Sequence, residues 1–150
     1  MPATAWHFAF ASNMNRAQMR SRVGEILEER PGRLENYELV FNKKVRGGTG
    51  GANLRSAPGK YVLGVLYKIH ESALRNLDRF EGAPQHYRRL EFPIQDANGQ
   101  TIPAQAFIAT KVDKPLRPAP HYLKTILDGA AEHSLPADYV EAIKASASLS

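Results

Sequence analysis

The segment KYVLGVLYKI, residues 60–69, decides the fold class of this chain. It is rich in β-branched and aromatic residues and carries no charge between its two lysines. Such a run is typical of a buried central strand. Gly64 lies in its interior, and a glycine at that place indicates close approach by another chain segment or by a ligand. We therefore expect a sheet built around residues 60–69.

A further strand is predicted on each side of a helix near the N-terminus. Residues 6–10 form a short aromatic and apolar run, and a helix capped by Ser12 or Asn13 is expected after it. Pro31-Gly32 predicts a break in the chain. After this break, residues 37–41 alternate in the manner of a strand.

The second half of the chain predicts a β-hairpin. Residues 87–94 and 101–109 are strand-like runs, and the sequence DANG at 96–99 joins them. Residues 46–51 hold four glycines in six positions, which predicts a loop or a bulged strand.

A helix is predicted before this hairpin. Ser72 is its expected cap, and Leu74, Leu77 and Phe80 recur at three-residue spacing, which favours one shared face. The helix is expected to end at Glu81-Gly82, because glycine commonly follows a last helical turn and Pro84 stands just beyond.

Two more helices are expected at the end of the chain, over about 121–131 and from about Leu135-Pro136, since proline suits a first helical turn. The tail 145–150 is small and polar and is expected to fray. With no internal repeat, these elements predict an α+β fold with a mixed, barrel-like sheet and flanking helices. A length of 150 residues suits a single domain over 1–150.

Composition narrows the class of protein. There is no cysteine, which excludes disulfides and thiolate zinc sites. The longest strongly apolar stretch, 61–67, is far short of the roughly 20 residues that a spanning helix needs, so we expect no membrane partner. The N-terminus shows no secretory pattern, and the cytoplasm is the expected location. The net charge is +5, but the basic residues are dispersed, so no nucleic-acid partner is expected.

Several common catalytic signatures do not occur. The glycine loop at 47–51 matches neither a nucleotide-phosphate loop nor a dinucleotide-binding turn. The histidines at 7, 70, 86, 121 and 133 show no spacing that would place two of them on one metal ion. Ser12 does not lie in a nucleophile elbow. We therefore expect no metal and no cofactor.

Four dispersed segments form a recognisable set: FAFASNM at 8–14, GAN at 51–53, LDRFEG at 77–82, and GA at 129–130 followed by LPADY at 135–139. In this order and spacing they resemble the γ-glutamylcyclotransferase (AIG2-like) superfamily. Its members carry a Tyr-Gly-Ser-Asn turn, a Leu-Asp-x-x-Glu-Gly helix end and a late Gly-Ala…Leu-Pro-x-x-Tyr segment. The strand VLGVLY at 62–67 is also similar to a strand of that family. The resemblance runs from about residue 6 to 144.

The resemblance implies a γ-glutamyl cyclotransferase. The α-amine of a γ-glutamyl compound would attack its own side-chain amide, releasing 5-oxoproline and an amine or amino acid. Glu81 would be the general acid/base, because one carboxyl can remove a proton and later return it. Burial is expected to raise its pKa, and backbone N–H groups of the turn would bind a carboxylate or oxyanion. The substrate-binding residues so implied are Phe10, Ala11, Ser12, Asn13, Met14, Asn53, Tyr87 and Tyr122.

One departure from the family pattern leaves alternatives open. Phe10-Ala11 stand where the family has Tyr-Gly, which removes a phenol and a residue that accepts positive φ. There are two alternatives. One is the same fold acting on a γ-glutamyl group of a secondary metabolite, and the other is a non-catalytic small-molecule binding module. The leaving group is equally open: a free amino acid, a polyamine, the ε-amine of lysine, glutathione or a secondary metabolite. The only expected partner is a small γ-glutamyl substrate, bound by a monomer or weak homodimer.

Overall fold

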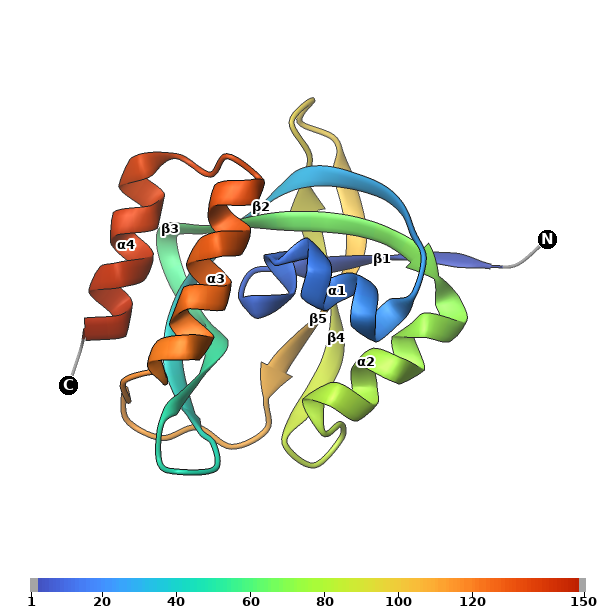
Figure 1. Ribbon diagram of the computed structural model, residues 1–150. Coiled ribbons are helices and arrows are strands. Elements are labelled where there is room, and N and C mark those ends of the chain that lie inside the picture. The colour runs from blue at the N-terminus through green and yellow to red at the C-terminus, as the bar shows by residue number, and fades with distance from the viewer. Residues whose placement is uncertain (1–2, 149–150) are drawn as a thin grey trace.

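A closed β-barrel forms the centre of the structure (Figure 1). The computed structural model describes residues 3–148. Going around the barrel, the strands follow the order β1-β3-β2-β4-β5. Strand β1 pairs in parallel with β5, whereas the other neighbouring pairs are antiparallel, so the predicted mixed, barrel-like sheet is confirmed. The strands are β1 (Thr4–Ala9), β2 (Ile26–Lys44), β3 (Gly50–His70), β4 (Tyr87–Gln95) and β5 (Thr101–Ala109).

The two longest strands, β2 and β3, pair with each other along most of their length. The predicted break at Pro31-Gly32 is wrong, because β2 continues through it with Gly32 opposite Gly64. A side chain at position 32 would place its Cβ 3.0 Å from both Phe8 and Ile94. A larger residue at position 32 would therefore need these side chains to shift, and Gly32 suits the tight packing inside the barrel. Pro31 is tolerated because β2 has only one registered pair with β4 in the described residues, at Arg33, so few ladder hydrogen bonds are needed on that side.

Two glycine-based expectations for β3 are confirmed. A Cβ at Gly64 would lie 2.2 Å from the carbonyl oxygen of Ala9, so this glycine permits the close approach of β1. The glycine-rich segment is a loop over 46–49 and becomes strand at Gly50, opposite a register shift between Phe41 and Lys43. The segment is thus both a loop and the start of an irregular strand pair.

Helix α1 (Arg16–Val23) begins later than expected. Ser12 and Asn13 belong to a short 3₁₀ turn, Ser12–Met14, rather than to a helix cap. The cap is Asn15, whose side chain accepts a hydrogen bond from the backbone N–H of Gln18 at 3.2 Å. A tight turn therefore separates β1 from α1 and leaves Ser12 and Asn13 available for another role.

Helix α2 (Leu74–Glu81) ends as predicted, with Gly82 in the left-handed conformation at φ 66°. Its start and one face differ from expectation. Ser72 lies inside a preceding 3₁₀ turn, and no side chain caps the helix. Leu74 and Leu77 are buried but Phe80 is 57% exposed. Phe80 follows Leu74 by six residues, and at about 100° per residue its side chain points in a clearly different direction from that of Leu74.

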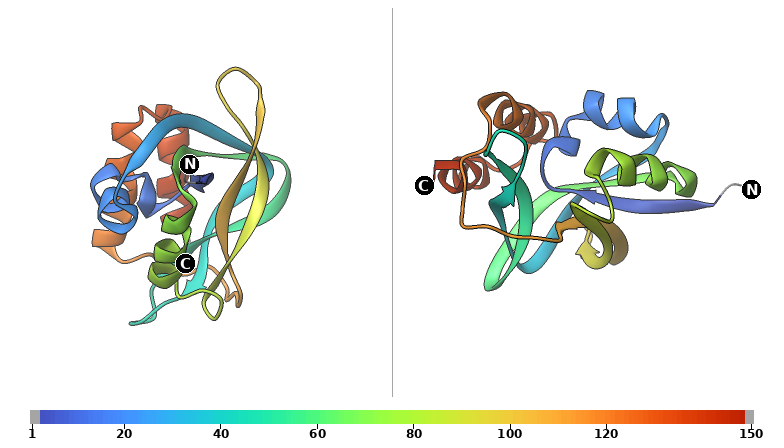
Figure 2. Two further views of the ribbon diagram at one scale, coloured as in Figure 1. Left: turned by 90° about the vertical axis from the view of Figure 1, so that its right-hand side faces the viewer. Right: turned by 90° about the horizontal axis from the view of Figure 1, so that it is seen from below.

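Helices α3 (Pro120–Glu132) and α4 (Ala137–Ser148) lie side by side on one flank of the barrel (Figures 1 and 2), and the start of α1 meets the end of α3, where the Arg16 backbone N–H donates to Glu132 at 2.9 Å. A Cβ at Gly129 would be 2.5 Å from the backbone nitrogen of Asn15, so this glycine lets α3 pack directly on the 12–14 turn. The expected fraying is wrong for 145–148, which are helical with Ala147 buried. Residues 149–150 lie outside the described residues.

The predicted hairpin of β4 and β5 is confirmed, and its tip projects from the barrel (Figure 1). Over residues 3–148, no helix combines the length and apolar character that a membrane crossing demands.

Candidate active site

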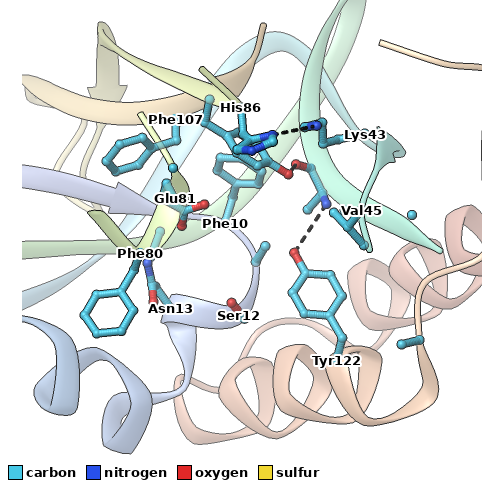
Figure 3. Close-up of a pocket in the computed structure, with 18 of the residues that line it drawn as sticks. Phe10, Ser12, Asn13, Lys43, Val45, Phe80, Glu81, His86, Phe107 and Tyr122 are labelled. Atoms are coloured by element: carbon cyan, nitrogen blue, oxygen red, sulfur yellow. Dashed lines mark hydrogen bonds between the residues drawn. The ribbon is translucent and has the colours of Figure 1, made fainter. Parts of the chain in front are cut away.

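A cavity of about 880 Å³ opens where one end of the barrel meets α2 and α3 (Figure 3). Its lining comes from regions that are far apart in sequence. These are the end of β1 with the following turn, the facing ends of β2 and β3, the end of α2 with the start of β4, and the start of α3. The cavity brings together Phe10, Ala11, Ser12, Asn13, Glu81, Tyr87 and Tyr122 of the sequence-predicted site.

Glu81 is the last residue of α2 and lines this cavity. Within the described part of the chain, no other carboxylate contributes to the lining. Burial raises the pKa of Glu81 above its ordinary range, and the nearby positive charge of Arg22 partly opposes that rise. The closest approach, from Arg22 Nη1 to Glu81 Oε1, is 4.0 Å, which is too long for a hydrogen bond. Glu81 is therefore disposed to hold a proton more readily than a surface glutamate.

The 10–13 turn faces Glu81 across the cavity (Figure 3). Helix α1 fixes two of its side chains: Gln18 Nε2 donates to Ser12 Oγ at 2.8 Å and to Asn13 Oδ1 at 3.1 Å. Ala11 has φ −134°, outside the left-handed region, so alanine replaces glycine here without the strain of a positive φ. The backbone N–H of Met14 donates to the Ala11 carbonyl and is used within the turn.

Two tyrosines build the wall formed by β3. The hydroxyl of Tyr87 donates to the Ala52 carbonyl at 2.9 Å, and the backbone N–H of Ala52 donates to the Tyr122 hydroxyl at 3.3 Å. Burial raises the pKa of both phenols, that of Tyr122 to about 12. Both side chains are therefore neutral at physiological pH, and each anchors the cavity wall as well as lining it.

Two of the sequence-predicted contacts lie outside the cavity lining. Met14 is fully buried, and its carbonyl accepts hydrogen bonds from the Tyr67 hydroxyl at 3.1 Å and from His133 Nε2 at 2.9 Å. Asn53 is also buried: its Nδ2 donates to Asn42 at 2.9 Å, and its Oδ1 accepts from the backbone N–H of Ala109 at 2.9 Å. In this structure both residues join neighbouring elements behind the cavity rather than facing it.

Sequence reasoning missed Arg22. Its Nη1 donates to Asn13 Oδ1 at 3.2 Å, and its guanidinium lies 4.8 Å from the centre of the Phe80 ring, in addition to facing Glu81. Arg22 thus connects the turn to the end of α2. Nothing in the local sequence of α1 signals this role, since it depends on how α1 packs against α2.

Lys43 and His86 were missed as well. Lys43 at the end of β2 and His86 just before β4 lie together on the cavity wall, with Lys43 Nζ 3.4 Å from His86 Nδ1. A contact between residues 43 positions apart leaves no periodic signal in the sequence.

Within residues 3–148, no three His, Asp or Glu side chains come close enough together to hold a metal ion. His7 lines the cavity, and burial lowers its pKa to about 4, so it is neutral at physiological pH.

Comparisons with known proteins agree with one another. The sequence model described as the AIG2-like family matches residues 51–143. A protein of Homo sapiens named gamma-glutamylcyclotransferase is 30% identical over 146 residues, covering 93% of this chain and 77% of that protein. The one from Mus musculus is 28% identical over 150 residues, covering 95% and 78%. A solved gamma-glutamyl cyclotransferase superposes with a TM-score of 0.88 at 28% identity, covering 95% of this chain and 88% of that one.

Proposed function

This chain belongs to the AIG2-like family, and from that membership we propose that it is a γ-glutamyl cyclotransferase with Glu81 as its general acid/base. The similarity to relatives named gamma-glutamylcyclotransferase supports the activity. The observation that carries the catalytic assignment is the isolation of Glu81: within the described residues it is the sole carboxylate of the cavity lining, and it faces the 10–13 turn.

The reaction needs only one substrate molecule. The α-amine nitrogen of the γ-glutamyl group forms a bond to the side-chain amide carbon, which closes a five-membered lactam. The bond from that carbon to the leaving nitrogen then breaks, giving 5-oxoproline and a free amine. Because nucleophile and electrophile belong to one molecule, holding the folded conformer can supply about 7–11 kcal/mol of the barrier.

Glu81 would move protons from the attacking nitrogen to the leaving nitrogen. The substrate amine arrives as an ammonium, and the Glu81 carboxylate removes a first proton so that the nitrogen can attack. The resulting carboxylic acid then protonates the leaving nitrogen, which restores the carboxylate. The same carboxylate takes the second proton from the attacking nitrogen, which becomes the lactam N–H, and passes it to the departing amine, which leaves as an ammonium. A raised pKa suits both steps, because it makes the carboxylate a better base and keeps the acid form accessible near neutral pH.

The turn would bind the charged oxygens of the substrate. Backbone N–H groups of Ala11, Ser12 and Asn13 are the candidate donors to the substrate carboxylate or to the developing oxyanion. The Asn13 side chain is held by Gln18 and Arg22, so the turn is rigid before substrate binds. Phe10 and Tyr87 would supply apolar wall area, and Tyr122 a hydroxyl.

The test is 5-oxoproline release by the purified protein from a panel of γ-glutamyl amino acids, γ-glutamyl amines and glutathione. We expect turnover of at least one panel member, and loss of that turnover in Glu81→Gln. Glu71→Gln is the matched control, because it makes the same change at an exposed residue outside the cavity lining. A protein that binds these compounds but releases no 5-oxoproline would instead be the non-catalytic binding module.

We further propose that the enzyme acts in the cytoplasm as a monomer or weak homodimer. The absence of cysteine from the sequence suits a reducing compartment. Sedimentation over a concentration series, with activity measured at each concentration, tests this assignment.

A further inference from the structure

The cavity lining is strongly asymmetric in charge. Against the single carboxylate of Glu81, five cationic side chains contribute to the lining: Arg22, Lys43, Lys44, Arg46 and Arg79. A γ-glutamyl group carries one ammonium and one carboxylate and is therefore neutral overall. The excess positive charge has no counterpart in that group, so it is available to the part of a ligand that leaves.

Lys43 differs from the paired lysines of this protein. Its Nζ donates to the Lys44 carbonyl at 3.2 Å and lies 3.4 Å from His86 Nδ1. Neither of these partners carries a negative charge. By contrast, Lys60, Lys124 and Lys144 each lie within 3.4 Å of a carboxylate. Of the five cations in the cavity lining, Arg22 faces Glu81, and the ion pairs among the described residues leave Lys43, Lys44, Arg46 and Arg79 without a carboxylate partner. A partly buried ammonium of this kind gains most from an anion supplied by a ligand.

The position of Lys43 and His86 fits the leaving group. Figure 3 shows both on the side of the cavity away from Asn13 and Phe80. If the γ-glutamyl group lies against the turn with its amine at Glu81, the leaving portion extends toward Lys43 and His86. This step rests on the proposed function. Arg46, in the loop between β2 and β3, also lines the cavity and adds a second cation close to Lys43 in the sequence.

We propose that Lys43, Arg46 and His86 form an anion subsite for the leaving amine, and that the preferred substrates are γ-glutamyl conjugates of acidic amino acids. A leaving amino acid with two carboxylates matches two cations of the cavity lining, whereas a polyamine would meet like charge. Such pairs in a solvated cavity discriminate only modestly between ligands, and salt weakens them.

The experiment compares γ-glutamyl-glutamate with γ-glutamyl-glutamine, which differ only by a carboxylate and an amide of nearly equal shape. We expect kcat/KM to be about 5-fold higher for the glutamate conjugate at low salt, with the ratio falling as salt is raised. Lys43→Met should bring the ratio close to one. Lys111→Met is the control, because it removes the same charge from an exposed residue outside the lining and should leave the ratio unchanged.

The outcomes separate the subsite from the activity. Equal kcat/KM values for the two conjugates, unaffected by Lys43→Met, would overturn the subsite while leaving the cyclotransferase proposal intact. If neither conjugate releases 5-oxoproline, the proposed activity fails on this panel, and calorimetric binding of the same two compounds decides the subsite. Tighter binding of the glutamate conjugate that Lys43→Met abolishes supports it, and equal binding refutes it.

Discussion

Two glutamates of this protein have nearly the same exposure and opposite acid–base character. The Glu29 side chain, on β2, is 24% exposed, and that of Glu81, at the end of α2, is 22% exposed. Each faces an arginine of α1. A hydrogen-bonded Arg16 lowers the pKa of Glu29, whereas burial raises the pKa of Glu81 despite Arg22.

Pairing geometry explains the difference. Arg16 donates from Nε and Nη2 to the two oxygens of Glu29 at 2.7 and 2.9 Å, so the carboxylate is fully compensated. Arg22 instead donates Nη1 to Asn13 and stays 4.0 Å from Glu81. Similar side-chain exposure therefore accompanies a structural anion where the arginine is bidentate, and a candidate proton carrier where the arginine is held back and the carboxyl group is more deeply surrounded by protein.

The largest expected effect is on turnover in Glu81→Gln. The substitution keeps the shape of the side chain but removes its ability to carry a proton, so the rate of 5-oxoproline release should fall by about 10²–10⁴-fold. Substrate binding should persist, since the turn is unchanged. Glu29→Gln is the matched control and should retain most of the turnover; if both variants lose activity equally, the contrast between the two glutamates is wrong.

The second effect is on the pH dependence of Arg22→Met. Turnover should rise with pH as the substrate-free Glu81 becomes a carboxylate. Removing the positive charge of Arg22 raises the pKa of Glu81 further, so the rising limb of kcat/KM should move to higher pH. Activity lost near neutrality should be partly recovered in alkali.

Other charged and titratable groups also line this cavity, so a control for the limb is needed. They are Arg79 on α2, His7 on β1, Lys43 and Lys44 on β2, Arg46 in the loop after β2, His86 and Tyr87 at the start of β4, and His121 and Tyr122 on α3. Arg20→Met removes the same charge from an exposed residue of α1. If the rising limb of kcat/KM against pH lies at the same pH in Arg22→Met as in Arg20→Met and the wild type, Arg22 does not act through Glu81.

A third, smaller effect is on the stability of Glu29→Ala. Loss of the bidentate pair should lower the free energy of unfolding by about 1 kcal/mol at neutral pH, since both partners are partly solvated. Because the folded-state pKa of Glu29 is depressed, its contribution is present above the unfolded pKa and disappears as the pH falls through the folded value. Urea unfolding at neutral and acidic pH measures this; a deficit that persists unchanged in acid contradicts the ionic origin.

The smallest effect is on the stability of Glu81→Gln. A raised folded-state pKa means that ionised Glu81 costs stability at neutral pH and that the cost vanishes below the unfolded pKa. The glutamine variant should therefore match or slightly exceed the wild type at neutral pH, by no more than about 0.5 kcal/mol. A clear loss of stability would indicate that Glu81 has a structural role instead.

Local sequence determined much of the fold. The apolar run at 60–69, the DANG turn and the Gly82 helix end each depend on near neighbours, and the structure confirms all three. The prediction of a chain break at Pro31-Gly32 was wrong because it considered only the local preference of these residues. In the barrel, side chains of β1 and β4 fill the space beside Gly32, so the glycine serves close packing within a continuous strand. Where a barrel closes, tertiary packing can override the local conformational preference of individual residues.

For the site, the sequence by itself determined the identity of the candidate acid, at a helix end, and the turn that faces it. Only the tertiary structure decided what surrounds them. The contacts of Arg22 with Glu81 and of Lys43 with His86 join separate elements, so they exist only once α1, α2 and the barrel have packed. Packing likewise buried Met14 and Asn53 behind the cavity. Charge compensation depends on distances in space, and sequence spacing does not encode those distances.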